Sequence, residues 1–173
     1  ITISGDAQND EAFTELLAQF ELKEDDKLNH GLYENIKTQI TSLGLSRGYF
    51  DGTLANSRIE IQEHLRIANI KIHYRSGIRY RYGDISFSPF DIEQSLLDVL
   101  VPFKTGDEFT TNALYQLQEQ LQRTQYFSNS LVMPNTEESD NGYVPINVNL
   151  APTKSHYFDV GIGYGSDTKF RVS

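Results

Sequence analysis

The side chains that most often bind metals are present in this sequence without the spacing that a metal site requires. Cysteine is absent, which excludes a thiolate site and a disulfide framework. The histidines lie far apart, whereas a metal site needs three or four converging ligands. They are His30, His64, His73 and His156. We therefore predict no metal site.

Patterns typical of catalysis or nucleotide binding are also missing. No Gly-x-Ser-x-Gly nucleophile motif occurs. Gly161, Gly163 and Gly165 alternate, but Ser166 follows and no helical pattern comes next, so the dinucleotide-binding fingerprint fails. Carboxylate pairs are frequent, as expected on the solvated faces of an acidic chain. We predict that the chain is not an enzyme and binds no cofactor.

A basic and aromatic segment, residues 71–82, gives the strongest competing signal. Its cations alternate with tyrosines, a mixture expected where bases stack and phosphates pair. They are Lys71, Arg75, Arg79 and Arg81 with Tyr74, Tyr80 and Tyr82. The net charge of −9 argues against general phosphate affinity. A nucleic-acid-binding module is therefore the alternative hypothesis, and an amphipathic strand running into a junction is the favoured one.

The elements that carry these side chains repeat after about 80 residues. Residues 1–5 and 85–88 are predicted strands, and a helical pattern follows each. A second helix closes on Arg47-Gly48-Tyr49-Phe50 in the first repeat and on Arg123-Thr124-Gln125-Tyr126-Phe127 in the second. Two further strands then complete a β-α-α-β-β order. We expect two small α+β modules, which bind or space other molecules.

Capping residues and apolar periodicity locate the helices. Asn9 or Asp10 and then Asn29 can cap the helices of the first repeat, and Gly44 or Gly48 can end the second of them. The predicted core consists of apolar residues at helical spacing. These are Leu17, Phe20, Ile36, Ile40, Leu96, Leu117 and Leu121, with Ile92, Val99 and Phe103 on the same face as Leu96 and with Leu114 beside Leu117.

The strands of the two repeats are predicted from alternating apolar residues. Ile59 and Ile61 are odd-numbered, whereas Ile70 and Ile72 are even-numbered, so we place a β-bulge near Ala68-Asn69. In the second repeat, residues 131–133 form a short strand that Pro134 halts. Asn141-Gly142 is a hairpin signal before the return strand of residues 144–150.

The last residues have large side chains on one side of an extended segment and glycines on the other, a pattern typical of a membrane-barrel strand. The large side chains are those of Phe158, Val160, Ile162 and Tyr164. The sequence has no run of about 18 apolar residues that would form a membrane-spanning helix. It opens without Met inside a predicted strand, and we expect a fragment or a processed product.

These residues resemble a known family of domains. The junction Gly77-Ile78-Arg79-Tyr80-Arg81-Tyr82-Gly83-Asp84-Ile85 and the Tyr-Phe pair that ends the second helix resemble POTRA (polypeptide-transport-associated) domains. The segments 101–107, 124–128, 144–148 and 161–168 are similar to the TamA family, where the last POTRA domain runs into the first barrel strand. The resemblance covers the whole chain and is strongest after Arg79.

The resemblance implies a fold, a cellular location and a set of partners. Residues 1–82 and 83–153 would be the second and third POTRA domains, each a three-stranded mixed sheet with two helices on one face, and residues 154–173 the start of the barrel. The place would be the periplasm of a Gram-negative bacterium. Partners would be a TamB-like inner-membrane-anchored protein, unfolded outer-membrane clients and the barrel itself. BamA is the alternative parent.

The resemblance also implies where partners bind. The second strand of each module would be a free edge that pairs with an incoming chain. The candidate edges are Ser57, Arg58, Ile59, Glu60 and Ile61, then Leu131, Val132 and Met133. The junction would comprise Gly77, Tyr80, Tyr82 and Gly83, with Gly83 separating a strand that ends at Tyr82 from one that begins at Ile85. So short a connection predicts a semi-rigid pair.

Overall fold

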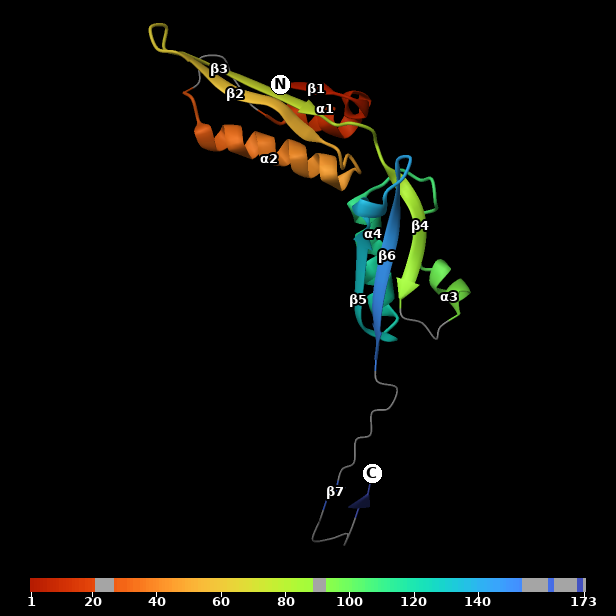
Figure 1. The fold of residues 1–173 in the computed structure, drawn as a ribbon. Coiled ribbons are helices and arrows are strands. Elements are labelled where there is room, and N and C mark those ends of the chain that lie inside the picture. Colours follow the sequence, from red (N-terminus) through yellow and green to blue (C-terminus); the bar gives the residue numbers. More distant parts are fainter. Residues whose placement is uncertain (21–26, 89–92, 154–161, 164–170, 173) are drawn as a thin grey trace.

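The computed structural model describes residues 1–20, 27–88, 93–153, 162–163 and 171–172. Figure 1 shows two units joined end to end, which we call the N-terminal half (residues 1–75) and the C-terminal half (residues 81–153), with residues 76–80 as the linker. No helix among the described residues is long and apolar enough to span a membrane.

The N-terminal half packs two helices on a three-stranded sheet (Figure 1). Its elements are β1 (Thr2–Ser4), the short 3-10 helix η1 (Asp6–Asn9), α1 (Glu11–Ala18), α2 (His30–Ser46), β2 (Thr53–Gln62) and β3 (Ile67–Arg75). The sheet order is β1-β3-β2, with β1 parallel and β2 antiparallel to β3. Asp10 caps α1 and Asn29 caps α2, as predicted. Gly48, with φ 82°, follows the end of α2, whereas Gly44 lies inside that helix.

The C-terminal half repeats this topology. Its elements are β4 (Arg81–Ser88), α3 (Gln94–Asp98), α4 (Thr111–Arg123), β5 (Phe127–Pro134), η2 (Thr136–Glu138) and β6 (Tyr143–Pro152). The sheet order is β4-β6-β5, with β4 parallel and β5 antiparallel to β6. The predicted α+β fold of two three-stranded mixed sheets is confirmed. Beyond it, β7 (Ile162–Gly163) pairs with β8 (Arg171–Val172).

Each half has its own apolar core between its helices and one face of its sheet. Ile36, Ile40, Leu117 and Leu121 are fully buried, as predicted, and Leu114 is 5% exposed. Leu17 and Phe20 are partly buried against the N-terminal core. Two separate cores follow from the two separate sheets.

The prediction was wrong for Leu96 and Val99. Leu96 is 62% exposed and Val99 81% exposed, whereas Leu97 is 3% exposed. The reason is that α3 has only five residues, so the longer helical face assumed from the spacing does not form. Ile92 lies outside the described residues.

The predicted β-bulge lies elsewhere. Residues 67–75 pair with β2 without interruption, and the register shift falls between Leu54 and Asn56. The change in apolar parity instead arises at the hairpin between β2 and β3, where Arg66 has φ 55° and Ile67 begins β3 with its side chain 47% exposed. In a sequence, a tight turn and a β-bulge both move the apolar residues from odd to even positions, so the pattern alone does not distinguish them.

Two glycines allow Tyr74 to be buried in the N-terminal half. The Tyr74 side chain is 1% exposed and stacks on Phe13, with ring centroids 5.8 Å apart. A Cβ at either Gly44 or Gly52 would overlap the Tyr74 hydroxyl. Glycine is therefore required at Gly44, inside α2, and at Gly52, between α2 and β2, for the Tyr74 side chain to keep this position. Burial raises the pKa of the Tyr74 phenol.

We predict that replacing Leu117 with alanine lowers the unfolding free energy by about 2–5 kcal/mol, because a cavity opens in the C-terminal core. Tyr115→Ala on the same helix is the control, since Tyr115 is 67% exposed. Urea unfolding followed by circular dichroism measures both. Equal, small effects of the two substitutions would contradict the placement of α4.

Candidate strand-binding edges and the junction between the halves

Among the described residues, no strand pairs with the outer edge of β2. The N–H of Ser76 donates to the C=O of Ser4, on the β1 side of β3. Backbone groups alternate sides along a strand, so even-numbered residues of β3 face β1 and odd-numbered ones face β2. By the observed register, Arg58, Glu60 and Gln62 bond to β3. Ser57, Ile59 and Ile61 therefore direct their backbone groups away from the sheet.

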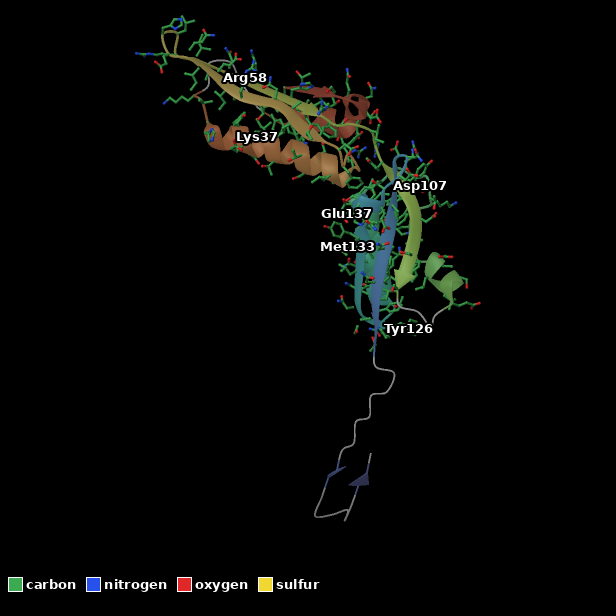
Figure 2. All side chains as sticks on the ribbon, viewed as in Figure 1. Lys37, Arg58, Asp107, Tyr126, Met133 and Glu137 are labelled. Carbon is green, nitrogen blue, oxygen red and sulfur yellow. The ribbon has the colours of Figure 1, made fainter. Side chains whose placement is uncertain are left out.

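The side chains along this edge differ between the two faces of the sheet. On the helix face Ile61 is 64% exposed. On the opposite face Glu60 accepts from Arg58 at 2.6 Å and pairs with Lys71 at 2.8 Å, and Figure 2 shows Arg58 on β2. Lys71, and then Arg58, hold the pKa of Glu60 below its usual range. A strand added here would lie beside apolar side chains on the helix face. On the opposite face it would lie beside charged side chains that already pair with one another.

The equivalent edge of β5 is shorter. The N–H of Asn135 donates to the C=O of Pro145, so odd-numbered residues of β5 face β6. Ser130, Val132 and Pro134 point outward, and Pro134 has no N–H to offer. Of the predicted residues, only Val132 presents its backbone to the open edge. Leu131 and Met133 instead expose side chains, each 43% exposed.

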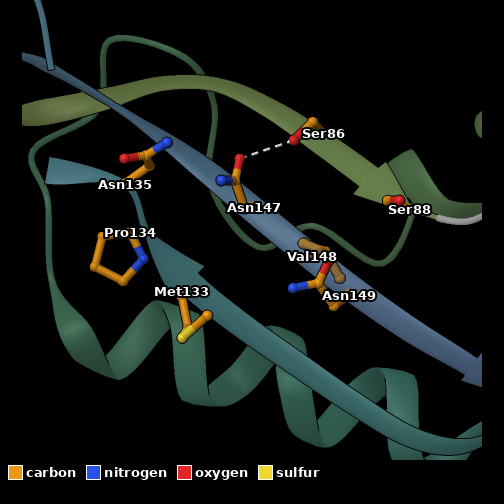
Figure 3. A pocket seen from close by; sticks show the side chains of 8 residues that line it. All are labelled: Ser86, Ser88, Met133, Pro134, Asn135, Asn147, Val148 and Asn149. Carbon is orange, nitrogen blue, oxygen red and sulfur yellow. Dashed lines mark hydrogen bonds between the residues drawn. The ribbon is translucent and has the colours of Figure 1, made fainter. Parts of the chain in front are cut away.

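A shallow hollow of about 440 Å³ lies on the open face of the C-terminal sheet, beside the β5 edge (Figure 3). The hydroxyl of Ser86 donates to Oδ1 of Asn147 across it, at 2.9 Å. Hydroxyls, amides, Met133 and Pro134 line it, and none of its lining side chains is ionisable. Such a surface can bind polar groups but has no acid, base or nucleophile activated for catalysis.

The linker between the halves is held by hydrogen bonds from both sides. The N–H of Tyr80 donates to Gly48 in the N-terminal half, and the C=O of Tyr80 accepts from Phe109 in the C-terminal half. The ring of Phe50 packs edge-on against Tyr80 and Phe109, with centroids 5.3 and 4.9 Å apart. The backbone of a single residue, Tyr80, therefore connects the two halves directly.

Ion pairs surround the backbone of Tyr80. Arg79 contacts Glu108 of the C-terminal half at 2.6 Å and Asp10 of the N-terminal half at 3.7 Å. Asp10 also accepts from Nε of Arg47 at 2.6 Å and from the hydroxyl of Tyr49 at 3.0 Å. Burial disfavours the Asp10 carboxylate, but these hydrogen bonds outweigh it and lower its pKa. Burial, and then Asp10, raises the pKa of Tyr49.

The predicted junction residues divide between the halves. Gly77, with φ 70°, turns the linker against Asp51. Tyr82 is buried in the C-terminal core and stacks on Phe103 at 3.8 Å. The predicted strand break at Gly83 was wrong, because β4 runs from Arg81 to Ser88 with only a register shift between Tyr82 and Ile85. Gly83 lies against the backbone of Val144 and Pro145, where a side chain would crowd it.

Sequence reasoning missed Asp10, Arg47, Phe50, Glu108 and Phe109 as junction residues. Arg47 and Phe50 lie in the repeated motif that ends the second helix, and Asp10 was predicted only as a helix cap. Glu108 and Phe109 carried no signal in the sequence. The tail residues Phe158, Val160 and Tyr164 lie outside the described residues, and Ile162 begins β7. Among the described residues, no group of three or more histidine, aspartate or glutamate side chains converges as a metal site.

The basic and aromatic segment 71–82 is largely used inside the protein. Tyr74 and Tyr82 are each 1% exposed, and Arg79 pairs with two carboxylates. Lys71 pairs with Glu60 and Arg81 with Glu108. Base stacking needs exposed rings, so this geometry disfavours the nucleic-acid hypothesis.

Solved structures share this arrangement. No family model matches the chain. POTRA domains 3–5 of BamA from Haemophilus influenzae align over 87% of this chain and 59% of that one, at 18% identity and a TM-score of 0.58. BamA from Haemophilus ducreyi lacking POTRA domains 1–3 aligns over 97% of this chain and 31% of that one, at 22% identity and a TM-score of 0.65. The chain has the POTRA fold. It spans less than two thirds of the length of either BamA chain.

We predict that acid weakens the junction through Asp10. Its folded pKa lies below the unfolded value of about 3.9, so its contribution to stability is present at neutral pH and is lost as pH falls below about 4. Asp10→Asn keeps the helix cap but removes the charge. It should lower stability by about 2–4 kcal/mol at neutral pH and flatten the acid dependence.

Thermal unfolding between pH 7 and pH 3 measures this effect. Asp140→Asn is the control, because the Asp140 carboxylate is exposed and bonds only to its neighbour Asn141 among the described residues. An Asp10→Asn variant that keeps the full acid dependence of the wild type would show that the carboxylate does not act as described.

Proposed function

We propose that the chain is the periplasmic scaffold region of an outer-membrane barrel assembly or translocation protein, most like TamA. The POTRA fold supports this proposal, as do the TamA-like segments at 101–107, 124–128 and 144–148. In this proposal the chain is not an enzyme. It binds unfolded outer-membrane proteins and a TamB-like inner-membrane-anchored protein. BamA is the alternative parent, because the two aligned structures described above are BamA.

The unit boundaries belong to this proposal. Residues 1–82 and 83–153 would be two POTRA units, and residues 154–173 would begin the first barrel strand. Since β4 begins at Arg81 and Tyr82 packs in the C-terminal core, the boundary is better drawn just before Arg81.

The proposed mechanism is strand addition, carried by the open edge of β2. At this edge no strand in the described part of the chain pairs with the backbone groups of Ser57, Ile59 and Ile61, whereas Pro134 blunts the edge of β5. Main-chain hydrogen bonds supply affinity that depends little on sequence, which suits clients of many sequences. We therefore propose β2 as the main client edge and Val132 on β5 as a secondary one.

We predict that Ile61→Pro weakens binding of an extended peptide about tenfold, because proline removes an outward N–H and its ring obstructs the edge. Ile61→Ala is the matched control, since it shortens the same side chain but keeps the N–H. The probe is a labelled ten-residue peptide of alternating valine and threonine, and fluorescence anisotropy measures its binding.

If Ile61→Pro and Ile61→Ala bind equally well, strand addition at β2 is wrong. Binding that falls steeply with added salt would instead favour a charged ligand, as the nucleic-acid alternative requires. Pairing of backbone groups with a neutral peptide should change little over the same salt series.

A further inference from the structure

The hairpin between β2 and β3 carries three exposed aliphatic side chains close together in the sequence. Ile61 is 64% exposed, Leu65 55% and Ile67 47%. We call residues 61–67 the hairpin tip. Figure 1 shows this turn projecting beyond the N-terminal end of α2. Single exposed apolar residues are common on protein surfaces, whereas a group of them at one place marks a binding surface.

The backbone of the hairpin tip is held in one defined turn. The N–H of Leu65 donates to the C=O of Gln62 at 3.1 Å, and the N–H of Arg66 donates to the C=O of Glu63 at 3.2 Å. Arg66 has φ 55°, in the left-handed region that residues with a side chain rarely adopt. Leu65 is therefore held in the turn, between the ends of the two strands.

The three aliphatic side chains point in different directions. Ile61 pairs with Ala68 and Gln62 pairs with Ile67, and successive residues of a strand alternate between the faces of the sheet. Ile61 therefore lies on the helix face and Ile67 on the opposite face, with Leu65 in the turn between them. A flat protein surface or an added strand would cover only one of these directions. An occupant that covers all three must surround the tip.

The charge near the hairpin tip differs from that of the whole chain. Three of the five charged side chains in residues 58–71 are cationic, namely Arg58, Arg66 and Lys71, and two are anionic, Glu60 and Glu63. The chain as a whole has 15 basic and 24 acidic residues. The tip can therefore approach an anionic surface that would repel most of this protein.

We propose that the hairpin tip inserts into the surface of a phospholipid bilayer. Lipids are fluid and close around side chains that point in several directions, and aliphatic side chains are stabilised at the boundary between headgroups and acyl chains. Arg66 reaches the lipid phosphates while its aliphatic stem lies along the acyl chains. The inference goes beyond strand addition, because it uses side chains of the turn and not the backbone of the β2 edge.

A single tryptophan at the hairpin tip tests this proposal, because the chain has no tryptophan of its own. Leu65→Trp is the probe variant. Leu45→Trp on α2 is the matched control, since Leu45 is also 55% exposed. Vesicles of equal amounts of phosphatidylcholine and phosphatidylglycerol should shift the fluorescence of Leu65→Trp to the blue, and brominated acyl chains should quench it at least about twofold. The fluorescence of Leu45→Trp should not change.

Vesicle flotation tests the same contact without tryptophan, which itself favours membrane interfaces. The wild type should float with the vesicles. The double variant Leu65→Glu, Ile67→Glu should bind at least about fivefold less, because a carboxylate among acyl chains is costly. Leu45→Glu is the control and should float like the wild type. All three positions are exposed, so the circular dichroism of the variants should match that of the wild type.

The other outcomes would overturn the proposal. Equal blue shifts of the two tryptophan variants would show general adsorption, and no shift with vesicles would show that the tip does not insert. A blue shift of Leu65→Trp that rises with protein concentration, without vesicles, would show that a second copy covers the tip. The peptide experiment on the β2 edge is separate, because a wild type that binds vesicles but not the valine and threonine peptide would contradict strand addition alone.

Discussion

The backbone of Tyr80 makes the contacts on which the arrangement of the chain depends. Its N–H is bound by Gly48 and its C=O by Phe109, so the two halves share one residue's hydrogen bonds. Phe50 fills the space beside it, and the Arg79 pairs with Asp10 and Glu108 surround it. Independent rotation of the halves would break these bonds together and leave the Asp10 carboxylate, 3% exposed, without one of its cationic neighbours.

A fixed junction would hold the open strand edges of the two halves at a constant distance and orientation. A three-stranded sheet with helices on one face has two edges, and proteins usually blunt such edges to prevent aggregation. Pro134 does this on β5, and β1 covers part of β3. The edge of β2 has no proline and exposes Ile61. An edge left open in this way, while Pro134 blunts the edge of β5, suits a binding surface.

Much of this fold could be predicted from the sequence, because most apolar residues that recur at helical or strand spacing are the residues that are buried. Leu114, Leu117 and Leu121 recur at helical spacing and are buried, and the repeat predicted that both halves share one topology. The failures occurred where local pattern competes with tertiary context. Leu96 fits the spacing of a longer helical face, but α3 ends at Asp98 and that face does not form. The apolar side chains change from odd to even positions after Ile61 because of the turn between β2 and β3, and not because of a bulge. Asp10 and Phe109 were missed because residues far apart in sequence make the junction.

The most direct test of this account is ¹⁵N relaxation of the wild-type chain in dilute solution. If the Tyr80 backbone and the ion pairs of Arg79 fix the junction, amides of α2 and α4 will fit one anisotropic rotational diffusion tensor for the joined halves. Separate, shorter correlation times for the two halves would contradict a fixed junction and, with it, a fixed relation between the proposed binding edges.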